Sequence, residues 1–156
     1  MSEFPRRTRT MNCTQGTDRP TSINYSFKVN GPWAAEILAG RKTVETPGQP
    51  CTKQGAAPGW VLLQGDTTRR KTTPTAEGAV KLGPRFKYET AAQFAADFEK
   101  HRVPAGDPYA FGKRATTYGF PVLDVIQFPN PVPVHHVNKL GQNRYKECEP
   151  VVVPPT

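Results

Sequence analysis

Lys42 and Glu45 are the two residues of this chain whose types and spacing could do chemistry together. A buried lysine can act as a base once its pKa falls, and a carboxylate can accept protons or hydrogen bonds. The pair follows an apolar pattern of helical spacing that ends at Gly40, where a helix terminus favours a left-handed residue. Residues 42–46 then change to the period of two that is typical of a strand. We therefore expect a helix that turns at Gly40 and carries the pair to the start of a strand.

Cations recur elsewhere in the chain, and the balance of 21 basic against 13 acidic residues gives a net charge of +8. Such a balance favours a polyanionic partner, of which nucleic acid is the first candidate. Recognition of single-stranded RNA uses aromatic rings for bases and Lys or Arg for phosphates. The segment 69–71 fits a solvated loop as well as a phosphate-binding loop, and Trp33 fits core packing as well as a base contact. The expected nucleic-acid-binding residues are Trp33, Arg41, Lys42, Thr43, Glu45, Arg69, Arg70, Lys71, Lys113 and Arg114.

The length of 156 residues suits one domain with a real core. Composition divides the chain into a basic, flexible N-terminal arm over 1–22, a domain over 23–137 and an extended tail over 138–156. No apolar run reaches the length of a membrane span, and no signal peptide precedes the domain. Three widely spaced cysteines fit reduced thiols and lack metal-ligand spacing. We expect a cytoplasmic or nuclear protein with no membrane partner, metal or cofactor.

Alternation and turn residues predict an α+β domain. Arg85–Tyr88 either extends a strand or begins a loop. Thr90 is the expected N-cap of a helix over 91–101. His101 falls in the last turn, where a cation complements the helix dipole, so we expect it to have a structural role. The expected strands cover 23–29, 60–64, 76–82 and 119–128, and a stiff proline-rich connector covers 129–134.

The segment Ile37–Glu45 resembles the signature of the ASCH domains, which belong to the PUA-like superfamily. That signature is a hydrophobic helix end followed by Gly-x-Lys-x-x-Glu-x-Arg. Gly40, Lys42 and Glu45 match its first three fixed positions, and Pro47 stands in the place of the arginine. Fold and function can therefore be anticipated from the family as well as from the residues.

Two further segments extend the resemblance over roughly residues 24–137. Gly78–Gly83 is similar to a central part of these domains, and Tyr118–Ile126 with the following Pro131–Val134 is similar to their C-terminal part. The resemblance implies a PUA-like mixed β-barrel flanked by short helices. It also implies that the domain binds RNA or acts on it, with a cationic cleft around Lys42 and Glu45.

A catalytic role is the second reading, and it leaves the question of enzyme activity open. Some ASCH members remove an acyl group from a modified nucleoside with a Lys, a Thr and a Glu. The resemblance places the lysine on Lys42, but the threonine falls on Glu45, and Asp97 or Glu99 of the later helix are candidates for the second acid. A small amidohydrolase or esterase, or a nuclease, would use Lys42 and Glu45 as its catalytic pair.

A reader of a modified base is the third reading. The related EVE and YTH-like domains hold one flipped base in an aromatic cage. Trp33, Trp60 and Tyr118 are the rings that would have to converge in this chain.

Overall fold

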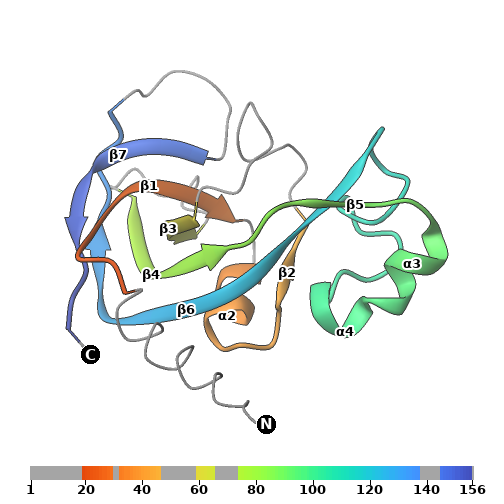
Figure 1. Cartoon of the computed structure of the whole chain (residues 1–156), viewed down its shortest axis with the longest axis horizontal. Coiled ribbons are helices and arrows are strands. Elements are labelled where there is room, and N and C mark those ends of the chain that lie inside the picture. Colours follow the sequence, from red (N-terminus) through yellow and green to blue (C-terminus); the bar gives the residue numbers. More distant parts are fainter. Residues whose placement is uncertain (1–18, 30–31, 47–58, 66–73, 138–144, 156) are drawn as a thin grey trace, which may run out of the picture.

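A computed structural model gives the positions of most of the predicted domain (Figure 1). The predicted site residues Arg69, Arg70 and Lys71 lie outside the described residues, as do Pro47 and most of the N-terminal arm. The described residues are 19–29, 32–46, 59–65, 74–137 and 145–155.

The fold is α+β, as the sequence predicts, and its main feature is one seven-stranded mixed sheet with short helices. The strand order is β2-β6-β4-β3-β1-β7, and β5 pairs with β6 outside this path. β1 and β3 run parallel, whereas the other pairings are antiparallel. The elements are β1 (Ser22–Val29), α2 (Trp33–Leu38), β2 (Val44–Glu45), β3 (Gly59–Gly65), β4 (Thr75–Leu82), β5 (Phe86–Tyr88), α3 (Ala91–Ala96), α4 (Phe98–His101), β6 (Thr117–Pro133) and β7 (Tyr145–Val152).

The predicted closure of the sheet into a PUA-like barrel is wrong. The two ends of the strand order are β2 and β7, and no ladder joins them in the described chain. β2 has only two residues, which is too short to build a closing ladder. β7 does touch the segment that follows β6, but only through the isolated bridge between His136 and Cys148 and two flanking backbone hydrogen bonds. The sheet is therefore curved but open.

β6 is longer than we predicted, with 17 residues. We expected a strand over 119–128 and a separate connector over 129–134, whereas the structure forms one continuous element. The register with β4 shifts within it, so that residues 128–131 have no partner in β4. Pro129 and Pro131 fall in this bulge, where a missing N–H removes no ladder hydrogen bond.

The predicted tail over 138–156 contributes the edge strand β7, which pairs antiparallel with β1. The rings of Tyr25 and Tyr145 stack across this pair at 4.9 Å and 10°. Cys148 and Val153 are buried in the core. The last part of the chain thus belongs to the same sheet as the first strand.

The predicted helix over 91–101 is divided in two. Thr90 is its N-cap, as predicted, because its side chain accepts a hydrogen bond from the Gln93 amide at 3.1 Å. Asp97 then leaves helical geometry, with φ −96° and ψ 15°, and separates α3 from α4. Arg102 ends α4 in the left-handed region with φ 61°. The two short helices pack with β5 and the start of β6 to one side of the sheet, away from β7 (Figure 1).

Gly78 in β4 provides a test of how closely α2 packs on the sheet. A Cβ at this position would lie 2.5 Å from the Ile126 carbonyl oxygen and 2.6 Å from Leu38 Cδ2. Because the first contact is backbone, we expect Gly78→Ala to lower the free energy of unfolding by about 1–3 kcal/mol in urea denaturation. Gly65→Ala is the control, since a Cβ there meets nothing within 4 Å. Equal midpoints for the two variants would contradict the close packing.

Candidate functional site

The turn after α2 places the signature residues. Gly40 has φ 82°, the left-handed conformation that we predicted for it. The amides of Arg41 and Lys42 then both donate to the Glu36 carbonyl oxygen at 3.0 Å. These bonds close the end of α2 and direct the Lys42 side chain back beneath the helix rather than into solvent.

Lys42 is fully buried, with 1% of its side chain exposed. Its Nζ donates to the His101 carbonyl oxygen at 2.5 Å and lies 3.5 Å from Glu45 Oε1. The same atom lies 4.8 Å from the centroid of the Trp33 ring, in cation–π contact. Burial lowers the pKa of Lys42, and the Glu45 charge opposes that shift. The predicted closeness of Lys42 and Glu45 is confirmed, but the ammonium lies inside the protein and not on an open rim.

The backbone around this pair joins three elements. The Thr43 amide donates to the Lys100 carbonyl oxygen of α4, and the Thr43 carbonyl oxygen accepts from the Val122 amide of β6, both at 2.8 Å. Glu45 pairs with Phe120 in the β2–β6 ladder. Thr43 itself is exposed. The signature segment is thus held between α4 and β6, and the ion pair lies at their junction.

His101 completes this junction, and its side chain is 1% exposed. Its Nδ1 accepts from the Val103 amide at 2.9 Å, so the proton lies on Nε2, 2.7 Å from the Phe94 carbonyl oxygen. The ring stacks on Phe94 with centroids 3.9 Å apart. Burial lowers the pKa of His101, and the Lys42 charge adds to that shift. The structural role that we expected is confirmed, but the imidazole is held neutral and does not act as a cation at the helix end.

The other predicted residues lie at the surface or in the core. Trp33 is half-buried and packs against two core clusters, one under α2 and one around Phe94. Arg41 is exposed and forms an ion pair with Glu36 at 2.8 Å. Lys113 and Arg114 are exposed on the loop before β6, so they do not share an open cleft with Lys42.

Glu45 lies at Lys42, but the two candidate second acids of the catalytic reading, Asp97 and Glu99, have other partners. Asp97 Oδ2 accepts a hydrogen bond from the Tyr88 hydroxyl at 2.8 Å. Glu99 pairs with Arg102 at 3.1 Å and is mostly exposed. The later helix therefore directs both of its candidate acids to partners other than Lys42.

The aromatic cage of the third reading does not form in the described chain. Trp33 lies beneath Lys42, and Trp60 packs against the core cluster around Leu62. Tyr118 lies beneath Arg85. The three rings occupy three different places.

The structure adds one group that we did not predict from the sequence, around Arg85 and Tyr118. The Arg85 guanidinium lies over the Tyr118 ring, 4.0 Å from its centroid. Lys87 is the register partner of Tyr118 in the β5–β6 pair. Because side chains two apart on a strand share a face, Arg85, Lys87 and Tyr118 form one continuous surface. The sequence is compatible with either a strand or a loop at Arg85–Tyr88, and the structure forms β5 there.

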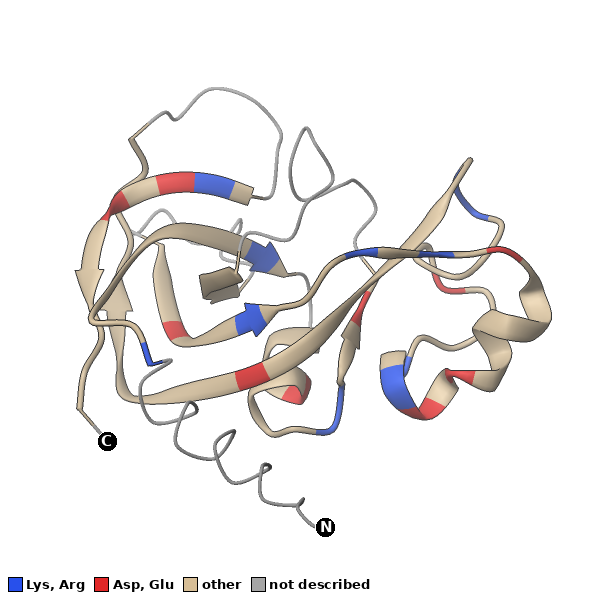
Figure 2. Cartoon of the chain, viewed as in Figure 1, with Lys and Arg blue, Asp and Glu red and all other residues tan. Residues whose placement is uncertain are grey.

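A second pair of the same kind lies on the loop before β6, where the Arg114 guanidinium is 5.7 Å from the Tyr109 ring centroid. Lys and Arg of β5 and of this loop occur in the lobe that carries α3 and α4 (Figure 2). We call Arg85, Lys87, Tyr118, Tyr109, Lys113 and Arg114 the arginine–tyrosine surface.

The described part of the chain has neither a metal-binding cluster nor a membrane-spanning helix. Its residues include no group of three or more His, Cys, Asp or Glu side chains placed to hold a metal ion. No helix within it is long and apolar enough to cross a membrane.

Comparison with protein-family models and with curated proteins found no match.

Proposed function

We propose that this chain is an ASCH-type domain that binds nucleic acid, with single-stranded RNA as its ligand. The observation that carries the proposal is the pairing of partly or fully exposed arginines with tyrosine rings, Arg85 on Tyr118 and Arg114 on Tyr109. A guanidinium over an aromatic ring offers a face for a base and donors for a phosphate at once. The net charge of +8 supports attraction of a polyanion to this surface.

The neighbouring cations support contacts along a strand of RNA rather than at one point. Lys87 is half-exposed and lies opposite Tyr118 in the ladder. Lys113 is exposed next to Arg114. Because phosphate contacts position a nucleic acid and rings stack on its bases, such a mixture suits an unpaired strand whose bases can turn outward.

The signature residues Gly40, Lys42 and Glu45 take a supporting part in this proposal. They fix the junction of α2, α4 and β6, and α4 belongs to the lobe that carries the arginine–tyrosine surface. The catalytic alternative has less support, because Lys42 is enclosed and position 45 carries a glutamate where the acyl-hydrolysing relatives carry threonine.

Binding to a fluorescent U12 RNA, measured by anisotropy at several salt concentrations, tests the proposal. We expect Arg85→Ala/Arg114→Ala to weaken binding about tenfold, since it removes two cations and their stacking faces. The slope of log K against log salt should become less negative by roughly 0.7 for each phosphate contact that is lost.

Arg19→Ala controls for the loss of one positive charge outside the arginine–tyrosine surface. Arg19 donates to the Pro154 carbonyl oxygen near the C-terminus, at the far end of the chain from this surface. It should leave both affinity and slope nearly unchanged. The proposal fails if the wild-type protein does not bind U12, or if the double variant binds it as the wild type does.

A further inference from the structure

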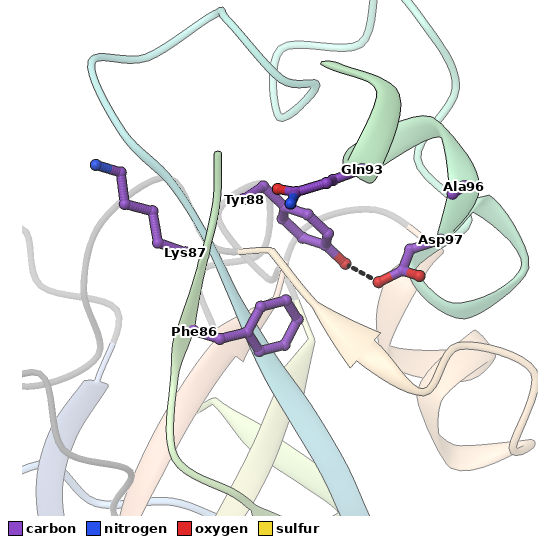
Figure 3. A pocket seen from close by; sticks show the side chains of 6 residues that line it. All are labelled: Phe86, Lys87, Tyr88, Gln93, Ala96 and Asp97. Carbon is purple, nitrogen blue, oxygen red and sulfur yellow. Dashed lines mark hydrogen bonds between the residues drawn. The ribbon is translucent and has the colours of Figure 1, made fainter. Parts of the chain in front are cut away.

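A pocket of about 340 Å³ lies between β5 and α3, on the face of β5 opposite Lys87 (Figure 3). Phe86 and Tyr88 point into the space between the two elements, whereas Lys87 points away from it at the rim. Sites for small ligands are typically concave, largely apolar and furnished with a few converging polar groups. The lining residues are Phe86, Lys87, Tyr88, Gln93, Ala96 and Asp97.

The polar groups of this pocket come from α3 and the residue that ends it. Gln93 lies in α3, and Asp97 is its C-cap, four positions further along the chain. The Tyr88 hydroxyl donates to Asp97 Oδ2 at 2.8 Å and fixes the plane of the carboxylate. The carboxylate stays accessible, with 26% of the Asp97 side chain exposed. Lys100 Nζ approaches the other oxygen, Oδ1, at 3.7 Å, which leaves acceptor capacity on both oxygens.

Gln93 supplies the complementary donor. Its Oε1 accepts from the Glu89 amide at 2.8 Å, which assigns the oxygen and nitrogen of this side-chain amide. Within the described residues, no group accepts a hydrogen bond from its Nε2. The pocket is thus lined by a carboxylate with spare acceptor positions and by an amide NH₂.

We propose that this pocket binds a guanine base, an inference that rests on the proposed RNA function and names the base it selects. Guanine alone among the four RNA bases has two adjacent donors, N1–H and the 2-amino group, next to an acceptor, O6. The two donors match the Asp97 carboxylate, and O6 matches the Gln93 NH₂. Uracil has a single donor between two acceptors, and adenine and cytosine would turn a ring acceptor toward the carboxylate.

Phe86 and Lys87 suit the ring face of the base and a phosphate group, respectively. The Phe86 ring, in edge-to-face contact with Tyr88 at 5.0 Å, borders the pocket and offers an aromatic surface to the base. Lys87 is 52% exposed, lies 3.8 Å from the exposed Glu89 carboxylate and points to the other face of β5, where it can meet a phosphate. The base would be read in the pocket while the RNA strand crosses the outer edge of β5 to Arg85 and Tyr118 on that other face.

Anisotropy titrations with U12 RNA carrying one central guanosine, inosine or adenosine test this inference. We expect guanosine to bind about tenfold or more tightly than adenosine, and inosine, which lacks the 2-amino group, to fall between them. Asp97→Asn retains an acceptor for the Tyr88 hydroxyl but loses the bidentate acceptor. It should abolish the preference and leave U12 binding unchanged.

Two further variants keep the result interpretable. Glu99→Gln removes the same charge from an 85% exposed side chain that does not line the pocket, and should keep the guanosine preference. Ala96→Phe fills the pocket from an exposed helix position without removing a hydrogen bond, and should lose the preference even if Asp97→Asn is poorly folded. Absence of a preference in the wild type, or its survival in Ala96→Phe, would overturn the inference.

Free nucleotides separate this inference from the proposed function. If U12 does not bind, the RNA proposal fails. Titration of ¹⁵N-labelled protein with GMP and AMP then tests, independently of RNA, whether the pocket binds guanine. Shifts of the Gln93 side-chain amide signals with GMP, absent with AMP and lost in Asp97→Asn, support a guanine site for a free nucleotide. Absence of these shifts in the wild type excludes it.

Discussion

Lys42→Ala is expected to lower the free energy of unfolding by about 3–5 kcal/mol, because it removes one partner of a buried ion pair. The substitution leaves the Glu45 carboxylate in a low-dielectric site without the ammonium 3.5 Å away. It also deprives the His101 carbonyl oxygen of its donor and the Trp33 ring of a cation. Urea denaturation followed by circular dichroism measures the loss.

The next residue provides a matched control. Arg41 carries the same charge but is 55% exposed in its pair with Glu36, so Arg41→Ala should cost no more than about 1 kcal/mol. Lys42→Met/Glu45→Leu should be more stable than Lys42→Ala, because it leaves no buried charge behind. It should not regain wild-type stability, since the His101 carbonyl oxygen still lacks a donor. Equal losses for Lys42→Ala and Arg41→Ala would contradict the enclosed ion pair.

His101→Phe is the second variant with a large expected effect, a loss of about 2–4 kcal/mol in the free energy of unfolding. Phenylalanine conserves the stacking on Phe94 but cannot bond to the Val103 amide or the Phe94 carbonyl oxygen. Both groups are then buried without their partner. Urea denaturation at neutral pH measures this loss.

His101 also predicts how stability depends on pH. Burial and the Lys42 charge lower the pKa of the folded imidazole below its ordinary value of 6.5. Below pH 6.5 the unfolded chain therefore binds a proton at His101 more readily than the folded chain does. The free energy of unfolding then falls as the pH drops, by at most about 1.4 kcal/mol per pH unit. His101→Phe should lose this dependence, whereas His135→Gln, at an exposed position, should keep it. If His101→Phe lost stability below pH 6.5 as the wild type does, another group would cause the pH dependence.

Local patterns predicted much of the secondary structure. The alternation of β1, the positive φ at Gly40 and the N-cap at Thr90 depend on neighbours in sequence, and the structure confirms each of them. The division between α3 and α4 was missed because helical spacing continues through Asp97. The residue that leaves helical geometry is Asp97, and its carboxylate accepts a hydrogen bond from Tyr88 of β5.

Long-range pairing accounts for the larger differences. The prolines of β6 suggested a connector, and only the register with β4 reveals a bulge that accommodates them. β7 lies in a polar, proline-containing segment whose strand character depends on the edge that β1 offers. The number of predicted strands does not show whether the sheet closes into a barrel. Closure depends on whether the two edge strands of the sheet pair with each other.

The sequence predicts that Lys42 and Glu45 act together, but it does not predict what surrounds them. The spacing of Lys42 and Glu45 placed them side by side, and the structure confirms this. Nothing local indicates that the Lys42 acceptor is a carbonyl oxygen 59 residues away. Arg85 on Tyr118 was missed for the same reason, since only the pairing of β5 with β6 brings them together.

The pairing of β1 with β7 has a consequence for the order in which the protein folds. Among the described residues β1 is the first strand and β7 the last, so one edge of β1 has no partner until β7 has been made. Contacts between such distant segments slow folding, because a long loop must close before they form. An unpaired strand edge is also a template for association with other chains. Until β7 pairs with it, the open edge of β1 is therefore a place where the partly folded chain can associate with other chains.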